Sequence, residues 1–297
     1  MDVMAASPLR IRFPALFLVL YGLTFLAGVP LNGYVFFIAS CRVERTVSTM
    51  WFLNRAMADL YFIIFLPVGL TTISLLNSEW AQRLSSYITS LHLFSSAFFL
   101  TALSVHRCIL LAHLMWAQNH CTSHLDFWVG LGIWALSLGF GLRYGDLWES
   151  LLQPARISDH FCLNEGRLKA GVVIQFLVGF LIPLALILIP IFYILLAAKL
   201  RRNRLSQSTK PLKILLGLVL TFFISWLPYH IYCFLQISTT YPPPLGIIKW
   251  YFVCVPAYFS SCLNPIFYLT MEDEFLRYRQ RARNPQTADN SGPEPAE

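Results

Sequence analysis

The sequence carries little charge for its length. Asp, Glu, Lys and Arg make up 12% of its 297 residues, whereas an ordinary soluble domain carries about 25%. Hydrophobic residues make up 57%, and the mean hydropathy is +0.59. This composition indicates a membrane protein and argues against buried helices of a soluble protein.

Several chemical signatures are also missing from the sequence. It has no Gly-rich phosphate loop, no metal-ligand cluster and no internal repeat. Its histidines and acids do not form a recognisable nucleophile, base and orienting group. We therefore expect neither an enzyme nor a bound cofactor or metal.

Long apolar windows recur along the chain. A helix needs about 20 apolar residues to cross a bilayer, and unpaired backbone groups are costly in hydrocarbon. The windows therefore predict an all-α fold, a bundle of seven transmembrane helices. They cover residues 13–39, 50–76, 84–112, 127–142, 170–198, 212–237 and 247–270.

The expected organisation is one membrane domain with short ends. We expect an extracellular N-terminus over residues 1–12, the membrane domain over 13–270, an amphipathic inner helix over 271–283 and a disordered cytoplasmic tail over 284–297. The first window is too long for the core of a signal peptide, so it is predicted to be a retained span.

The distribution of Lys and Arg predicts the orientation. With the N-terminus outside, 12 of the 22 Lys and Arg fall in inner segments, as the positive-inside rule favours. The net charge of +7 is then explained by topology and by anionic membrane lipids, so nucleic acid is not an expected partner. The inner cations are Arg42, Arg45, Lys199, Arg201, Arg202, Arg204, Lys210, Lys213, Arg277, Arg279, Arg281 and Arg283.

Ionisable residues inside predicted spans are costly, so they mark candidate functional positions. The spans contain Arg55, Asp59, His92, His106, Arg107, Arg143 and His230. A lone histidine is usually a packing residue. A charged cluster on two helices is harder to dismiss.

The helix motifs resemble those of rhodopsin-like G-protein-coupled receptors. The chain contains, in order, "GVPLN", "NRAMADL", "SVHRC", Trp134, Pro183, "FFISWLPY" and "NPIFY". Within that family, the stretches "HLMWAQNH" and "KPLKILLGLVLTFFISWLPYH" and Trp80 look most similar to the formyl-peptide, resolvin and chemerin group of chemoattractant receptors.

The resemblance implies a mechanism. It assigns Arg107, with its neighbour His106, to the G-protein switch at the inner end of the third helix, together with Asn264, Pro265 and Tyr268. It also implies that Phe222 and Trp226 form a packing toggle and that Pro228 kinks the sixth helix. A structural role for these aromatic residues in the core is the simpler alternative.

Asp59, Ser96, Ser261 and Asn264 match positions that bind sodium in many relatives. Arg55 precedes Asp59 by four residues and therefore lies on the same helix face. A buried carboxylate should pair with the nearest cation, so we expect Arg55 to replace the ion.

Three positions depart from the family pattern. His106 stands where relatives carry an acid, so Arg107 lacks its usual neighbouring anion. Ile191 stands where they carry a tyrosine, and Gln82 where they carry a disulfide cysteine. Cys162 therefore has no obvious partner: it is either a free thiol or paired with Cys233 or Cys254.

The ligand pocket is expected between the outer halves of the helices. Arg143 is a candidate for holding a ligand carboxylate, but it is equally able to pair with Asp146 or Glu149. The expected lining residues are Thr89, Leu93, Arg143, Gln175, Tyr229, His230, Cys233 and Tyr258.

The leading functional prediction is a plasma-membrane receptor for an extracellular peptide or lipid mediator. It would signal through a heterotrimeric G protein, with the inhibitory class favoured, and would also bind arrestin. An atypical decoy or scaffold receptor that does not activate G proteins is the alternative. A transporter or channel is a more distant one, because no inverted repeat is evident.

Overall fold

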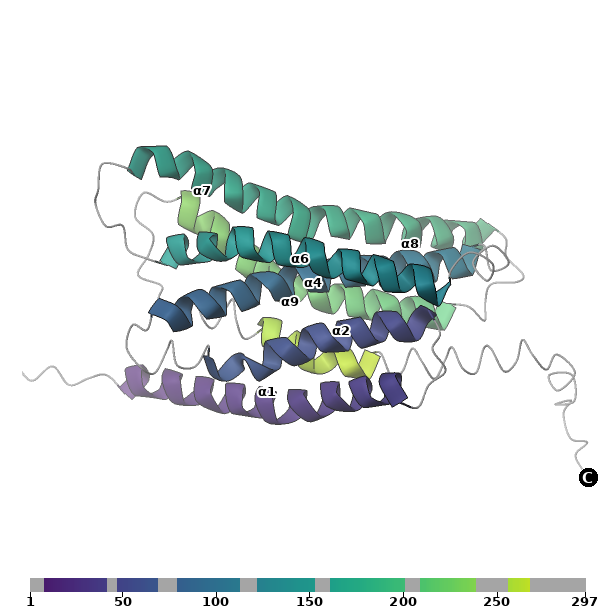
Figure 1. Ribbon diagram of the computed structural model, residues 1–297, viewed down its shortest axis with the longest axis horizontal. Coiled ribbons are helices and arrows are strands. Elements are labelled where there is room, and N and C mark those ends of the chain that lie inside the picture. The colour runs from purple at the N-terminus through teal and green to yellow at the C-terminus, as the bar shows by residue number, and fades with distance from the viewer. Residues whose placement is uncertain are drawn as a thin grey trace, which may run out of the picture.

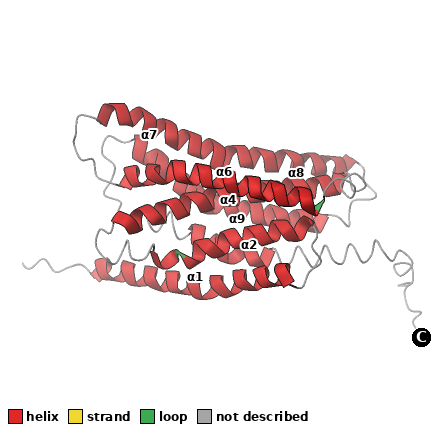
Figure 2. Ribbon diagram, viewed as in Figure 1, coloured by secondary structure: helices red, strands yellow, loops and turns green. Residues whose placement is uncertain are grey.

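The computed structural model describes residues 8–41, 47–68, 79–112, 122–152, 161–200, 209–238 and 256–267. Apart from short turns, these residues are helical, and none of them forms a strand (Figure 2). The helices are α1 (Pro8–Cys41), α2 (Val47–Ile64), α4 (Glu79–Ala112), α6 (Ser123–Leu152), α7 (Phe161–Phe176), η1 (Leu177–Leu181), α8 (Ile182–Leu200), α9 (Thr209–Ser238) and a last helix over 256–267.

The helices lie side by side as a bundle (Figure 1). Helices α7, η1 and α8 follow one another without a break and form one long rod. Helix α4 is central, since it contacts α2, α6, α8 and α9. We call the end of the bundle at which α1 begins the outer end, and the opposite end the inner end.

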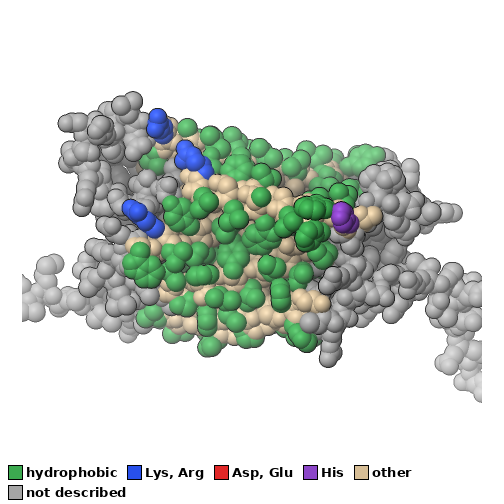
Figure 3. Space-filling view, viewed as in Figure 1, with side chains coloured by type: hydrophobic (Ala, Val, Ile, Leu, Met, Phe, Trp, Pro, Cys, Tyr) green, Lys and Arg blue, Asp and Glu red, His purple; other side chains and the backbone are tan. Residues whose placement is uncertain are grey.

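Among the described residues, six helical segments are long and apolar enough to cross a membrane, namely Leu18–Phe37, Met50–Val68, Arg83–Ile109, His124–Gly145, Gly166–Tyr193 and Leu215–Ser238. Large apolar side chains cover the face shown in Figure 3, and the visible Lys and Arg side chains lie toward the outer end. The helix over 256–267 packs in the same bundle and is the seventh rod (Figure 1). The predicted seven-helix membrane fold is confirmed.

Some helix bounds differ from the predicted windows. Helix α1 already begins at Pro8, inside the segment expected to be the N-terminus, and α6 runs from Ser123 to Leu152 instead of 127–142. Apolar windows detect only the lipid-crossing part, whereas helical hydrogen bonding continues into polar flanks. The amphipathic helix predicted over 271–283 and the tail over 284–297 lie outside the described residues.

A short π-helical segment interrupts the rod formed by α7 and α8. Over η1, the backbone N–H of Ile182 donates to the carbonyl of Leu177, five residues earlier. Pro183 follows directly and has no N–H to donate, so the change of hydrogen-bond spacing occurs where the regular ladder must break. Gly179 in this segment packs against Leu93 and Phe94 of α4.

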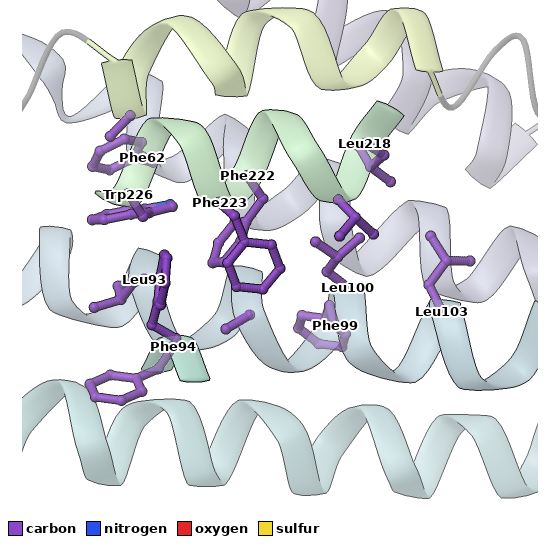
Figure 4. Packing of buried hydrophobic residues seen from close by; sticks show 14 of the residues in the cluster. Phe62, Leu93, Phe94, Phe99, Leu100, Leu103, Leu218, Phe222, Phe223 and Trp226 are labelled. Atoms are coloured by element: carbon purple, nitrogen blue, oxygen red, sulfur yellow. The ribbon is translucent and has the colours of Figure 1, made fainter. Parts of the chain in front are cut away.

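Aromatic side chains fill the middle of the bundle. Phe222, Phe223 and Trp226 project from α9 toward α4, and Trp226 lies between Phe62 and Leu93 (Figure 4). Phe222 and Trp226 are almost fully buried. This aromatic layer positions the polar groups described below.

Close approach of α1 to its neighbours favours a glycine. A Cβ atom on Gly28 would lie 2.7 Å from the Cys262 sulfur and 2.7 Å from a methyl group of Ile63. Four residues later, Asn32 donates from its side-chain amide to the carbonyls of Gly28 and Ser261, each at 3.0 Å. The motif "GVPLN" therefore ties α1 to the helix over 256–267.

Candidate functional site: a buried polar cluster and an inner arginine

An ion pair on α2 forms the base of a buried polar cluster. Asp59 is fully buried, and the Arg55 side chain is only 3% exposed. Arg55 Nε lies 3.7 Å from Asp59 Oδ2, which is ion-pair distance but longer than a hydrogen bond. The predicted pairing along one helix face is present, because residues four apart lie one turn apart.

His92 of α4 lies at the centre of this cluster. Its Nε2 is 3.1 Å from Asp59 Oδ1, 3.2 Å from Ser96 Oγ and 3.3 Å from Ser261 Oγ. The His92 side chain is fully buried. Three oxygens from three helices thus converge on one ring nitrogen.

The last helix closes the cluster. Asn264 donates from its side-chain amide to Asp59 Oδ2 at 3.0 Å. The two oxygens of Asp59 therefore contact Arg55 as an ion pair and His92 and Asn264 by hydrogen bonds. The four residues predicted to resemble a sodium site are brought together, and His92 joins them.

The aromatic toggle residues rest on the same cluster. The Arg55 guanidinium lies 5.9 Å from the centre of the Phe222 ring, and the His92 and Trp226 rings are 5.8 Å apart. The ring centroids of Phe222 and Trp226 are 6.3 Å apart, and the two residues are one turn of α9 from each other. Pro228 follows within the same helix. The predicted toggle therefore contacts the predicted ion site.

A stack of rings continues from His92 across α2. Phe62 lies parallel to the His92 ring at 3.8 Å, and Tyr258 lies parallel to Phe62 at 4.3 Å. Tyr258 was predicted to line the ligand pocket, and this stack places it one ring away from the polar cluster.

The inner arginine has different surroundings. Arg107 is 6% exposed, and its guanidinium carbon lies 5.4 Å from the centre of the Phe52 ring on α2, which is cation–π distance. His106 is also buried, and its Nδ1 has no hydrogen-bond partner within the described part of the chain. Asn264 lies at the polar cluster, next to Pro265, and Tyr268 falls outside the described residues.

Part of the predicted ligand pocket forms a cluster between α7 and α9. Gln175 donates from its side-chain amide to the Tyr229 hydroxyl at 2.8 Å. The His230 ring packs against Phe176 and Phe180 at 5.3 and 4.9 Å and against Tyr229. His230 is 2% exposed, and its Nε2 finds no hydrogen-bond partner among the residues that the structure describes.

The other predicted pocket residues have different surroundings. Thr89 is buried and donates its hydroxyl to the Ser85 carbonyl of its own helix at 2.7 Å. Leu93 is buried against Gly179. Arg143 is exposed on α6, with its guanidinium 5.7 Å from the neighbouring Tyr144 ring. The structure does not bring Arg143 to Gln175 and His230.

The partner of Cys162 stays open. Cys162, predicted to lie in an outer loop, falls in the first turn of α7, and its side chain is outside the described part. Cys233 is buried in α9, whereas Cys254 lies outside the described residues.

Comparison with known proteins identifies the family. The profile of the family described as "7 transmembrane receptor (rhodopsin family)" matches residues 32–268. The chain belongs to this family. The match spans most of the sequence and includes both the polar cluster and the inner arginine. Because the family consists of receptors, the expectation that the protein is not an enzyme is confirmed.

The relatives of this receptor include two chemoattractant receptor types. Rat chemerin-like receptor 1 is 31% identical, with 94% of this chain and 81% of the relative covered. Human chemerin-like receptor 1 is 30% identical over 92% of this chain and 79% of its own length. Human N-formyl peptide receptor 3 is 30% identical over 87% and 79%. The resemblance to the chemoattractant group is confirmed.

Two residues of this receptor's site were not predicted from the sequence, His92 and Phe52. His92 was noted as an ionisable residue in a span, and it precedes Ser96 by four residues. This spacing places both on one face of α4 and could have identified His92 as a member of the ion site. Phe52 carried no comparable signal, since an aromatic residue in an apolar helix is usually a packing residue.

Proposed function

We propose that this receptor lies in the plasma membrane with its N-terminus outside and signals to a heterotrimeric G protein, with the inhibitory class favoured. Its ligand is an extracellular peptide or lipid mediator. Two of its relatives are receptors named for chemerin and for N-formyl peptide, which favours a peptide. The cation-rich predicted inner loops support the orientation.

The observation that carries the proposal is the position of Arg107. It lies in the inner part of the central helix α4, buried against Phe52 of α2. A guanidinium keeps its charge in every conformation. Arg107 can therefore leave the Phe52 ring and bind hydrogen-bond acceptors of a partner protein without a change of protonation. This property suits a switch.

A series of contacts connects the outer half of the bundle to the polar cluster. Gln175 binds Tyr229, the Tyr229 and Trp226 rings are 5.6 Å apart, and Trp226 contacts His92. Ligand binding beside Gln175, Tyr229 and His230 would therefore act on Trp226 first. The orphaned His230 nitrogen is a hydrogen-bonding group that a ligand or a water could satisfy.

G-protein dissociation in cells tests the proposal. The receptor with Arg107→Ala is compared with the wild type at matched surface level, and Arg167→Ala serves as the control. Arg167 is an exposed cation on α7, so its loss changes the charge equally without touching the switch. We expect the basal or ligand-driven signal to be lost with Arg107→Ala and kept with Arg167→Ala.

An atypical receptor that recruits arrestin without activating G proteins is the second candidate. It is favoured by His106, which brings no fixed negative charge beside Arg107, and by Ile191, which is buried on α8 at the position where the family resemblance implies a tyrosine. A wild-type receptor at the cell surface that is silent with every G protein but recruits arrestin would support this candidate and contradict the first.

A further inference from the structure

The polar cluster is balanced in charge without any added ion. Asp59 contributes one negative charge and Arg55 one positive charge, and both side chains are almost fully buried. An isolated buried carboxylate is very costly, so it attracts a cation or a proton. Here the cation is a side chain of the same helix.

The imidazole of His92 also occupies the position where the oxygens of the cluster converge. The oxygens of Asp59, Ser96 and Ser261 that surround His92 Nε2 are hard ligands of the kind that small hydrated cations prefer. The opposite nitrogen, Nδ1, is buried and has no hydrogen-bond partner among the described residues. A proton on Nδ1 would therefore be unsatisfied, and the neutral tautomer with its proton on Nε2 fits the site.

The neighbouring groups leave this assignment unchanged. On α2, Asp59, Arg55 and the Tyr61 ring at 6.2 Å face His92. From α9 it meets Trp226, and from the last helix Ser261. Asp59 and Arg55 are thus the only formal charges among the described groups that face the imidazole, and they compensate each other.

We propose that Arg55 and His92 together replace a bound monovalent cation: Arg55 supplies the positive charge, and His92 occupies the position where the oxygens converge. Neither side chain does both, because Arg55 is 3.7 Å from Asp59 and the neutral imidazole carries no charge. The receptor therefore does not bind sodium at Asp59. This inference concerns the folded receptor itself and does not depend on coupling to a G protein.

A double-mutant cycle on the purified, full-length receptor tests the proposal. The apparent unfolding temperature is measured in sodium chloride and in choline chloride of equal ionic strength for the wild type, Arg55→Leu, His92→Ala and the double variant. Arg55→Leu removes the charge but keeps the position filled. His92→Ala opens the position but keeps the charge balanced.

We expect a sodium-specific rise in unfolding temperature only in the double variant. A ligand that binds only the folded state at several times its Kd raises the midpoint by about 2 °C or more in a protein of this size. The further change Asp59→Asn in the double variant should abolish the rise, because it removes the charged ligand. A second double variant, Arg55→Leu with His92→Asn, keeps a polar side chain in the site and should also respond.

Three results would overturn the proposal. A sodium-specific shift in the wild type would mean that the site is not closed. A shift in either single variant would mean that one of the two side chains does not have its assigned part. Folded double variants that both lack a sodium response would mean that the two side chains do not stand in for an ion.

Discussion

The polar cluster and the inner end hold their arginines in contrasting ways. Arg55 lies beside a carboxylate that also receives an imidazole and an amide. Arg107, on the neighbouring helix, lies over the ring of Phe52 and beside a neutral residue type, His106. Arg55 belongs to a charge-paired network, whereas Arg107 contacts the face of an aromatic ring.

This difference has an energetic consequence. Separating a buried ion pair leaves an uncompensated charge, which is strongly destabilising. A cation–π contact such as the one between Arg107 and Phe52 is weaker, worth about 0.5–2 kcal/mol. We therefore expect the polar cluster to be rigid and the inner end to change state readily, which is the arrangement a switch requires.

The largest predicted effect comes from removing the carboxylate of the cluster. Asp59→Asn leaves the Arg55 cation buried without its counter-charge and should lower the free energy of unfolding by about 3–5 kcal/mol. The measurements are apparent unfolding temperature and the fraction of protein at the cell surface. Adding Arg55→Leu should restore much of the loss, since the orphaned charge is then gone.

A conservative change outside the cluster provides the control. Asn54 lies on α2, five residues before Asp59. Its Oδ1 accepts a hydrogen bond from Trp134 Nε1 at 2.9 Å, and its side chain is only partly buried. Asn54→Ala should cost far less than Asp59→Asn, because no charge is left unpaired. Equal losses would show that the cluster is not held by its charge pair.

The second prediction concerns the inner end and assumes the proposed coupling. Phe52→Leu removes the ring beneath Arg107, a contact worth about 1 kcal/mol, and should shift the equilibrium toward the active state roughly five-fold. His106→Asp places a negative charge next to Arg107 in the sequence and should lower basal signalling. Basal G-protein dissociation at matched surface level measures both changes.

An aromatic residue of α4 away from the arginine is the matched control. Phe98 packs against Phe94 and Phe140 instead of Arg107. Phe98→Leu should leave basal signalling unchanged. If Phe52→Leu and His106→Asp also leave basal signalling unchanged, the contact between Arg107 and Phe52 does not restrain the switch.

The sequence allowed the fold to be predicted almost completely, because lipid-crossing helices need long apolar windows and each window can be identified without its neighbours. The Arg55–Asp59 pair was predictable for a related reason, since both residues lie on one helix and their spacing fixes their distance. Helix ends such as Pro8 and Leu152 were not predictable, because polar flanks continue the helix without an apolar signal.

The contacts between helices were harder to predict. His92 meets Asp59 only because α2 and α4 pack with a particular register and rotation, which depend on close approaches throughout the bundle. The position of Arg107 over Phe52 depends on the same packing. Arg143 was predicted to line the pocket from its place near the end of a span, and the structure adds only that it is exposed on α6.

The smallest predicted effect examines the redundancy of the polar cluster. Ser96 Oγ is one of three oxygens around His92 Nε2, and a neutral imidazole offers only one proton there. Ser96→Ala removes one oxygen, while the contacts with Asp59 and Ser261 remain. The expected loss in free energy of unfolding is about 0.5 kcal/mol, at the lower end of the range for a buried hydrogen bond.

The paired variant Ser261→Ala should behave alike, because the Ser261 hydroxyl lies 3.3 Å from His92 Nε2 and can also donate to the Ala257 carbonyl of its own helix. Thermal unfolding of both variants against the wild type provides the measurement. A loss as large as that of Asp59→Asn would mean that the hydroxyls, and not the charge pair, carry the cluster. The contrast with the inner arginine would then rest on hydrogen bonding instead of on charge.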